Sequence, residues 1–169
     1  MDAGKVRFLG LSNTIQENVR KAHAVHPISV VQAPYSLFDR SAETFFPVLE
    51  KLEVGLVAYR PLARGFLTGA VKTLDGYSAG DFRRRNPWWA PANFGTNVAI
   101  AEELSELAQS KGATLSQLSL AWLLARKPFI VPIPGSRNAD RVTEITIATD
   151  LLLTPEDHIE QIIRNSAAI

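Results

Sequence analysis

Residues 55–59 read Gly-Leu-Val-Ala-Tyr, a short apolar run that is typical of a strand buried in a parallel sheet. Comparable runs lie at residues 6–11, 28–33 and about 128–134. Longer amphipathic stretches separate these runs, so predicted strands and helices alternate along the chain. This order predicts an α/β fold of parallel β/α units joined by right-handed crossovers.

The helices that alternate with these strands have recognisable start signals. Thr14 is the predicted N-cap of the first helix, and Thr154 followed by Pro155 begins the last. Helices are therefore expected at residues 14–26, 41–53, 97–111 and 114–126, and from about residues 138 and 154 onward. Residues 65–95 contain repeated glycine and proline and predict an irregular loop, which in a compact domain is usually functional or disordered.

The composition excludes several classes of function. The chain has 169 residues, a formal net charge of +1, no cysteine and three histidines. The absence of cysteine excludes disulfides and thiolate metal sites, and so few histidines predict no metal centre. The balanced charge argues against nucleic acid as a partner, and no apolar run reaches the roughly 20 residues that span a bilayer. We therefore expect one soluble, cytoplasmic domain over residues 1–169, without a nucleic-acid or membrane partner.

Polar side chains follow the predicted strands, where function gathers in β/α folds. Ser12, Asn13 and Gln32 offer uncharged hydrogen-bonding groups, and Tyr59 offers a flat ring. Each has a structural explanation when taken alone: a turn for the Ser-Asn pair, a buried partner for Gln32, and a core or rim position for Tyr59. Their coincidence at successive strand ends favours a ligand with an amide-bearing ring.

A second polar set follows the fourth predicted strand. Gly135, Ser136 and Arg137 precede Asn138 at the start of a predicted helix, where free backbone N–H groups and the helix dipole favour a phosphate. Arg141 lies four residues after Arg137 and is expected to share its helix face. This helix start is a weak motif by itself, but beside an amide-binding region it indicates a nucleotide site.

Four segments of the chain give a more specific signal. They read Gly-Lys-Val-Arg-Phe-Leu-Gly-Leu-Ser-Asn at 4–13, Val-Gln-Ala-Pro-Tyr-Ser-Leu at 31–37, Ala-Tyr-Arg-Pro-Leu-Ala-Arg-Gly-Phe-Leu-Thr-Gly at 58–69 and Ile-Pro-Gly-Ser-Arg at 133–137. In this order they resemble successive segments of the aldo-keto reductase family. The resemblance implies a (β/α)8 barrel enzyme that moves a hydride between NADP(H) and a carbonyl or alcohol. The chain resembles strands five to eight, so the expected fold is the C-terminal half of a TIM barrel.

The resemblance also implies roles for individual residues at a cofactor site. The positions that hold the nicotinamide carboxamide are matched by Ser12, Asn13 and Gln32, and the ring that stacks on the nicotinamide is matched by Tyr59. The segment along the pyrophosphate supplies Arg60, Leu62 and Arg64, with Arg60 where the family commonly has Ser. The 2′-phosphate and adenine positions are matched by Gly135, Ser136, Arg137, Arg141 and Glu144, and Ile145 stands where Asn is common.

The loop at residues 65–95 corresponds to the segment that lies over the substrate in this family. The resemblance therefore implies that Trp88, Trp89 and Phe94 line an apolar pocket for a small carbonyl substrate. Three arginines at residues 83–85 lie beside the tryptophans, a combination that also occurs in nucleic-acid binding. For a chain this close to neutral, a solvated loop is the preferred interpretation.

The family's proton-transfer residues are an Asp, a Tyr, a Lys and a His in the first half of its barrel, and no segment of this chain matches their motifs. Tyr35 and Tyr77 lack a recognisable Lys and His constellation, so no catalytic residue is assigned. The favoured hypothesis is the NADP(H)-binding half of an aldo-keto reductase that is inactive alone. Two alternatives stay open: a pseudoenzyme that serves as a non-catalytic NADP(H)-binding or assembly module, and a truncated product with no selected function.

Half of a barrel leaves two open strand edges and an uncovered inner face. Open edges and apolar faces both favour association with another chain. We expect pairing with a separate N-terminal half-barrel chain, self-association of the chain into a homo-oligomeric pseudo-barrel, or repacking into an open sandwich.

Overall fold

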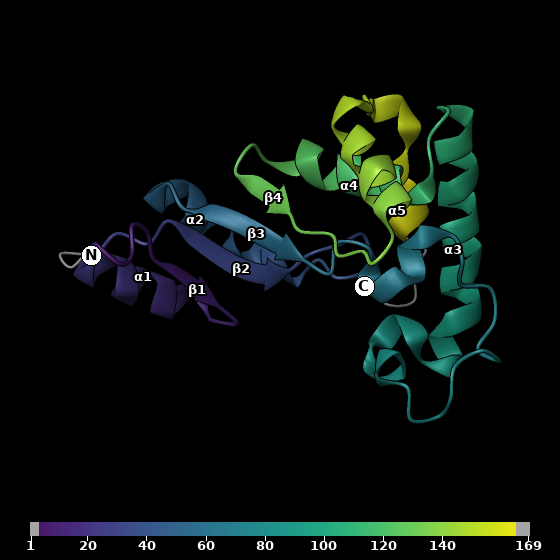
Figure 1. Cartoon of the computed structure of the whole chain (residues 1–169), viewed down its shortest axis with the longest axis horizontal. Helices are drawn as coiled ribbons and strands as arrows, with labels where there is room; N and C mark the ends of the chain where they lie inside the picture. The colour runs from purple at the N-terminus through teal and green to yellow at the C-terminus, as the bar shows by residue number, and fades with distance from the viewer. Residues whose placement is uncertain (1–3, 165–169) are drawn as a thin grey trace.

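Within residues 4–164, four parallel strands form one sheet, in the order β1-β2-β3-β4 (Figure 1). The computed structural model describes residues 4–164, and its strands are β1 (Gly10–Ser12), β2 (Val30–Pro34), β3 (Gly55–Tyr59) and β4 (Ile130–Pro132). All neighbouring pairs in the sheet are parallel, which confirms the expected α/β fold of parallel β/α units. The third strand has the predicted bounds, whereas β1 begins four residues later than expected, at Gly10.

Helices alternate with these strands, and the last predicted helix is split in two. Thr154 caps a 3-10 helix at Pro155–Asp157 before the final helix begins. The α-helices are α1 (Gln16–Val25), α2 (Phe46–Leu52), α3 (Pro91–Ser110), α4 (Leu115–Arg126), α5 (Ala139–Thr146) and α6 (Ile159–Arg164). Within residues 4–164 no helix has the length and apolar character needed to cross a membrane.

Two helix starts and one loop differ from the prediction. The residue before α1 is Ile15, which is extended and makes no side-chain capping bond, so Thr14 is not the N-cap. Helix α3 begins at Pro91 rather than near residue 97, because proline suits the first turn of a helix. The expected irregular loop is partly ordered into 3-10 helices at Ala63–Thr68, Phe82–Arg85 and Pro87–Trp89.

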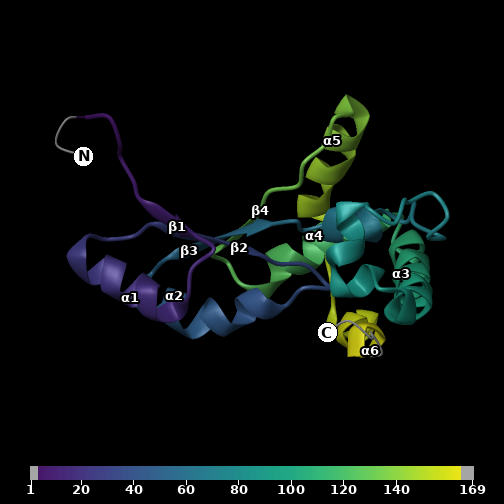
Figure 2. The same ribbon diagram turned by 90° about the horizontal axis from the view of Figure 1, so that it is seen from below.

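The register of the sheet places alternate residues on two different faces. One face packs against helices, and α1 and α2 run along one side of the sheet in Figure 2. The side chains that the four strands contribute to this packed face are Leu11, Val31, Leu56 and Ile130. The other face is open: Gln32 and Val57 are half-buried there, and Val131 is 57% exposed. The sheet therefore keeps one partly apolar face that the described residues cover only in part.

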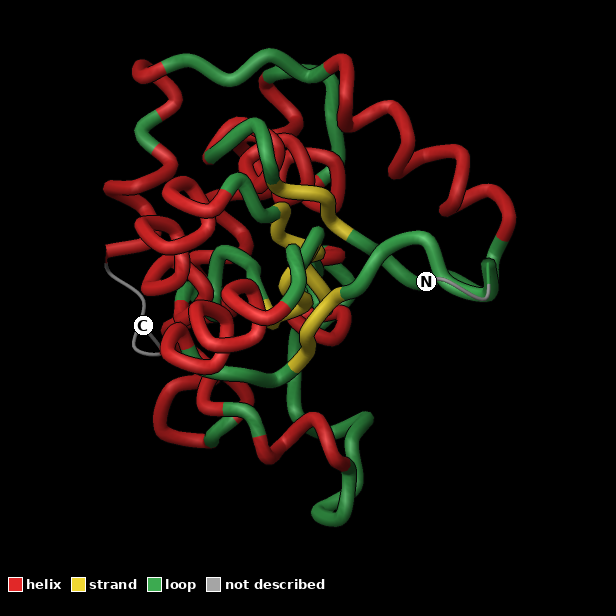
Figure 3. Tube along the Cα trace, turned by 90° about the vertical axis from the view of Figure 1, so that its left-hand side faces the viewer, coloured by secondary structure: helices red, strands yellow, loops and turns green. Residues whose placement is uncertain are grey.

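An aromatic cluster joins the segment after β3 to the start of α3. The ring of Trp89 is fully buried and contacts the rings of Phe66 and Tyr77 at centroid distances of 5.2 and 4.7 Å. Phe94 completes this group at 5.8 Å from Trp89. Figure 3 shows the strands (yellow) in the interior with helices (red) mainly on one side. Edge-to-face aromatic packing of this kind stabilises a core beyond the area that it buries.

Candidate functional site

The carboxyl ends of the first three strands bring four predicted site residues together. Ser12 lies directly opposite Gln32 in the register, and its hydroxyl donates to Gln32 Oε1 at 3.3 Å. The Tyr59 hydroxyl donates to Asn13 Oδ1 at 2.8 Å. Gly10 permits this close approach of β1 to β2, because a Cβ there would lie only 2.8 Å from a methyl carbon of Val30.

Left-handed backbone conformations are concentrated where these strands end. Asn13 follows β1 with φ of 49°, and Arg60 follows β3 with φ of 54°. Ala63 and Arg64 repeat this conformation in the next turn, with φ of 49° and 58°. Asparagine tolerates this conformation, but for residues such as arginine and alanine it costs roughly 1–2 kcal/mol each. Strain of this kind is a common feature of binding sites, so the turn after β3 is a candidate ligand-binding segment.

The turn after β3 also contains two unneutralised cations. The Arg60 guanidinium lies 5.0 Å from the centroid of the Tyr59 ring. The Nε atom of Arg64 is buried and has no hydrogen-bond partner among the described residues. Burial and the nearby charge of Arg60 lower the pKa of Arg64. Within residues 4–164 neither arginine forms an ion pair with a carboxylate, so this turn presents positive charge without a counter-ion.

A cavity of about 860 Å³ lies beside this turn. Six residues predicted for the pyrophosphate, 2′-phosphate and adenine positions line it: Leu62, Gly135, Ser136, Arg137, Arg141 and Glu144. Ile145, which was expected at the adenine end, lines it too, and four further lining residues were not predicted for the site: Thr68, Ala70, Ser116 and Asn138. The structure therefore brings the start of α5 to the segment that follows β3.

Helix α5 starts near the predicted position, with Asn138 as its N-cap, but Arg137 precedes the helix and so does not share a helix face with Arg141 as expected; both line the cavity. The Asn138 side chain accepts hydrogen bonds from the backbone N–H groups of Asp140 and Arg141 at 2.8 and 3.3 Å. Arg137 and Arg141 are exposed, and neither forms an ion pair with a described residue. A helix N-terminus with two free guanidiniums is well suited to a phosphate group.

Helix α4 holds α5 in this position. Thr114, the N-cap of α4, donates from its hydroxyl to Glu144 Oε1 at 2.7 Å. Gln117 in the same capping box donates from Nε2 to the Glu144 backbone carbonyl at 2.8 Å. Since Glu144 has both a side-chain and a backbone contact to α4, the cavity wall is fixed by tertiary packing rather than by α5 alone.

The tryptophans and Phe94 expected at the substrate lie in the core instead of lining this cavity. Trp88 Nε1 donates to the Ala63 carbonyl at 3.3 Å, so the buried Trp88 side chain anchors the left-handed turn after β3 to the core. Trp89 and Phe94 pack against Phe66 in the aromatic cluster. Large apolar rings are favoured in the interior, and these rings supply much of the core of their own segment. Their contact with substrate stays a prediction.

The basic run at residues 83–85 is partly neutralised by its own loop. Arg83 donates from Nε to Asp81 Oδ1 at 2.9 Å, and its guanidinium lies 4.4 Å from the Tyr77 ring centroid. Hydrogen bonds from Arg83 lower the pKa of Asp81 to about 2. The run therefore has a structural role in ordering the loop.

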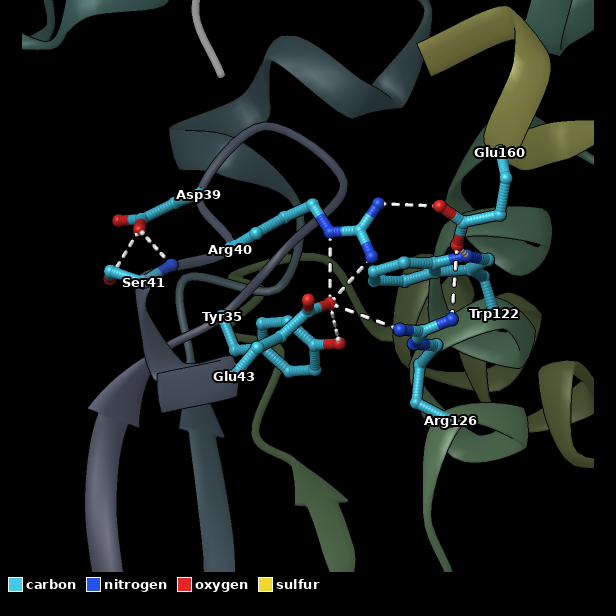
Figure 4. A network of polar contacts seen from close by, with 8 residues as sticks. All are labelled: Tyr35, Asp39, Arg40, Ser41, Glu43, Trp122, Arg126 and Glu160. Carbon is cyan, nitrogen blue, oxygen red and sulfur yellow. Dashed lines mark hydrogen bonds and ion pairs between the residues drawn. The ribbon is translucent and has the colours of Figure 1, made fainter. Parts of the chain in front are cut away.

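A second polar cluster lies away from the cavity and joins three segments of the chain (Figure 4). Glu43 accepts from the Tyr35 hydroxyl and from Arg40 Nε, both at 2.8 Å, and from Arg126 at 3.3 Å. Glu160 of α6 binds the same two arginines at 2.6 and 3.1 Å. The cluster is therefore neutralised internally, with two carboxylates shared between two guanidiniums.

Trp122 lies between the two arginines of this cluster. The Arg40 and Arg126 guanidiniums are 5.2 and 5.3 Å from its ring, and its Nε1 donates to Glu160 at 3.1 Å. Burial and the hydrogen bond to Glu43 raise the pKa of Tyr35. Because Tyr35 is fully buried and its hydroxyl is committed to Glu43, it is not placed to donate a proton to a substrate. No group of three or more acidic, His or Cys side chains in the described part of the chain is arranged for a metal ion.

A partial ring of parallel β/α units with polar residues at its carboxyl edge is the arrangement of TIM-barrel enzymes. The sequence model of the aldo/keto reductase family matches residues 1–163, and the chain belongs to this family. It is 39% identical over 148 residues to an NADP(+) aldo-keto reductase of Schizosaccharomyces pombe, a match that covers 85% of this chain and 44% of the relative. It is 37% identical over 158 residues to an aldo-keto reductase of Strobilurus tenacellus, covering 91% and 47%.

Two solved structures resemble the fold. The glycerol dehydrogenase of Gluconobacter oxydans superposes with a TM-score of 0.91 at 27% identity, over 99% of this chain and 52% of that protein. A thermostable aldo-keto reductase solved with the inhibitor epalrestat gives 0.72 at 27% identity, over 98% and 50%. The chain thus spans about half the length of the relatives it matches. Since aldo-keto reductases are TIM barrels, the fold is half of such a barrel.

Proposed function

We propose that this chain is the NADP(H)-binding part of an aldo-keto reductase, corresponds to strands five to eight of the barrel, and supports hydride transfer between NADPH and a carbonyl compound. One observation supports this most directly. The amide side chains and the Tyr59 ring lie at the carboxyl end of the sheet, together with four arginines that have no carboxylate partner among the described residues: Arg60, Arg64, Arg137 and Arg141. The NADP(+) in the name of the Schizosaccharomyces pombe relative favours the same cofactor.

The residues at the strand ends fit the nicotinamide half of such a cofactor. Ser12, Asn13 and Gln32 together offer the donors and acceptors that a carboxamide needs. Tyr59 offers a ring face for stacking. The buried Nε of Arg64, which has no described partner, is a donor suited to a pyrophosphate oxygen.

The cavity beside the turn fits the adenosine half. Arg137 and Arg141 at the start of α5 are suited to a 2′-phosphate, which distinguishes NADP(H) from NAD(H). Glu144 lies on the same wall and is the proposed adenine contact. Glu144 is fixed by Thr114, so we expect the adenine position to be defined before the ligand arrives.

The reaction needs both a hydride and a proton. The bound cofactor supplies the hydride, and the residues of this chain orient its ring. The developing alkoxide needs a proton donor, which Tyr35 cannot provide from the core. We assign that donor to an N-terminal half-barrel, whose four β/α units close the barrel over the open face of the sheet. A second copy of the chain could also close the ring, but it would bring no such donor.

The test is a fluorescence titration of the purified chain with NADPH, run beside size-exclusion chromatography. We expect saturable binding with a dissociation constant near the micromolar range, and weaker binding of NADH because it lacks the 2′-phosphate. Gln32→Leu, which keeps the side-chain size but removes the amide, is expected to weaken binding of both. Absence of saturable binding by a folded chain would reject the proposal.

The pseudoenzyme alternative is separated by a second measurement. The chain is mixed with an N-terminal half-barrel from an active relative, and aldehyde-dependent NADPH oxidation is followed. If the reconstituted barrel turns over substrate and the chain alone does not, the result supports the proposal that the chain is part of an enzyme. Cofactor binding without turnover in a reconstituted, folded barrel supports a non-catalytic NADP(H)-binding module.

A further inference from the structure

Arg60 differs from the two arginines of the cavity, Arg137 and Arg141, in what it contacts. Its guanidinium lies over the Tyr59 ring at 5.0 Å, and it does not line the cavity that Arg137 and Arg141 share. Leu62, only two residues later, does line that cavity. Arg60 therefore places its charge at the ring end of the site, not at the adenosine end.

The backbone of the turn that carries this charge is constrained. Arg60 has φ of 54°, and its carbonyl accepts the Ala63 N–H at 2.9 Å, which closes the turn. Arg64 in the same turn is a second cation, and no described carboxylate pairs with either residue. The ring of Tyr59 is in turn held at its hydroxyl by Asn13. The site thus keeps an unneutralised positive charge beside its aromatic platform.

We propose that Arg60 is a specificity-determining residue that makes the site favour the reduced over the oxidised nicotinamide cofactor. This inference rests on the proposed function. The oxidised nicotinamide ring has a formal positive charge, whereas the reduced ring is neutral. If the nicotinamide stacks on the Tyr59 ring, the Arg60 guanidinium beside that ring repels the positively charged oxidised form and leaves the neutral reduced form unaffected.

The expected size of the effect follows from Coulomb's law. Two unit charges about 8–10 Å apart, with an effective dielectric constant between that of a protein surface and that of water, change a binding constant by about 3- to 10-fold. The effect should fall with ionic strength, because Arg60 is exposed and salt screens charges at this separation.

Two other roles for Arg60 give different results. A guanidinium that contacts only the pyrophosphate strengthens binding of both redox forms by the same factor. A guanidinium that only supports the turn changes the stability of the chain and leaves the ratio of the two affinities unchanged. The ratio of the NADP(+) to the NADPH dissociation constant is therefore the quantity to measure.

Isothermal titration calorimetry of the purified chain with NADPH and NADP(+) gives this ratio. The variants are Arg60→Asn, which removes the charge with a residue that tolerates positive φ, and Arg60→Lys, which keeps the charge. We expect the ratio to fall about 3- to 10-fold in R60N and to stay near the wild-type value in R60K. Arg60→Glu should lower it further, because a carboxylate attracts the oxidised ring.

Arg137→Ala is the matched control, since it should weaken both redox forms equally. Thermal melting of each variant verifies that it is folded. An unchanged ratio in folded R60N, with NADPH still bound, overturns the inference and leaves the proposed function intact. Binding of neither form by the folded wild-type chain overturns both.

Discussion

Two groups of arginines in this chain have opposite surroundings. Arg40 and Arg126 share Glu43 and Glu160 and stack on the two sides of Trp122 (Figure 4). The arginines of the carboxyl edge have no carboxylate partner within residues 4–164: they are Arg60, Arg64, Arg137 and Arg141. The carboxylates of the protein neutralise the first group, whereas the positive charge of the second group remains available to an anionic ligand.

This difference separates stability from binding. A guanidinium that is paired and stacked in a packed layer contributes to the folded state, and its loss leaves other buried groups unsatisfied. An unpaired guanidinium at a strand end contributes little to folding and adds repulsion to its neighbours. We therefore expect changes in the first group to alter the free energy of unfolding, and changes in the second to alter ligand affinity.

The largest effect is expected from Trp122→Ala. Trp122 is 4% exposed and packs against Tyr35 at a centroid distance of 5.5 Å, besides the two arginines. Removing it should lower the free energy of unfolding by about 3–5 kcal/mol, measured by urea denaturation. Leu124→Ala on the same helix, at a side chain 36% exposed, is the control and should cost less than about 1 kcal/mol. Equal losses at the two positions would contradict the structural role of the cluster.

The next largest effect is expected from the double variant Arg137→Ala, Arg141→Ala. Loss of both guanidiniums should weaken NADPH binding by roughly 100-fold or more, because each hydrogen bond to a charged group contributes about 1.5–3 kcal/mol. Affinity for NADH and the urea midpoint should stay close to wild type. Arg20→Ala on the exposed side of α1 is the control. A double variant that loses stability but keeps its NADPH affinity would reverse the distinction between the two groups.

Glu160→Gln should have a smaller, pH-dependent effect. Burial raises the pKa of Glu160, but the hydrogen bonds and charges of Arg40 and the bond from Trp122 outweigh burial and lower it. Since the folded pKa lies below the unfolded one, the carboxylate stabilises the protein above pH of about 4.3, and this contribution is lost as pH falls through the folded pKa.

The side chain of Glu160 is 42% exposed, so solvent screening limits its contribution to roughly 1 kcal/mol at pH 7. Urea denaturation at a series of pH values should show E160Q less stable than wild type at neutral pH and the two curves converging in acid. If the free energies of unfolding of E160Q and wild type differed by a constant amount from pH 7 to pH 3, the charge of Glu160 would not be the cause of the difference.

The smallest effect is expected at an ion pair outside both groups. Lys21 and Glu17 form an exposed pair one turn apart on α1, with side chains 70% and 65% exposed. Lys21→Ala should change the free energy of unfolding by less than about 0.5 kcal/mol. A loss of stability as large as that of E160Q would mean that the partial burial of the ion pairs around Glu160 adds nothing to their contribution.

Local sequence signals predicted some elements well and others poorly. The run at residues 55–59 gave the bounds of β3 because it is apolar and lies in the middle of the sheet, paired on both sides. The run at 6–11 became a strand only from Gly10, where it pairs with Val30 of β2. An edge strand extends only as far as its neighbour pairs with it, which apolar character does not reveal.

The candidate site was predicted in the same uneven way. Residues at strand ends and at the start of α5 could be found, because turn and cap chemistry mark them in the sequence. Asn138 was recognised as part of a helix start but not as a cavity residue. Ser116 had no local signal, since it reaches the cavity only because α4 packs against α5 through Glu144.

Sequence by itself determined the β/α alternation, the family resemblance and the residue types at the strand ends, because periodicity, capping and turn chemistry act over a few residues. Tertiary structure decided which charges are neutralised. Arg40, Arg126 and Glu160 are far apart in the chain and meet only when α6 packs against α4 and the loop after β2. It likewise decided that Trp88 supports the turn after β3 from the core, because burial depends on contacts that no local pattern specifies.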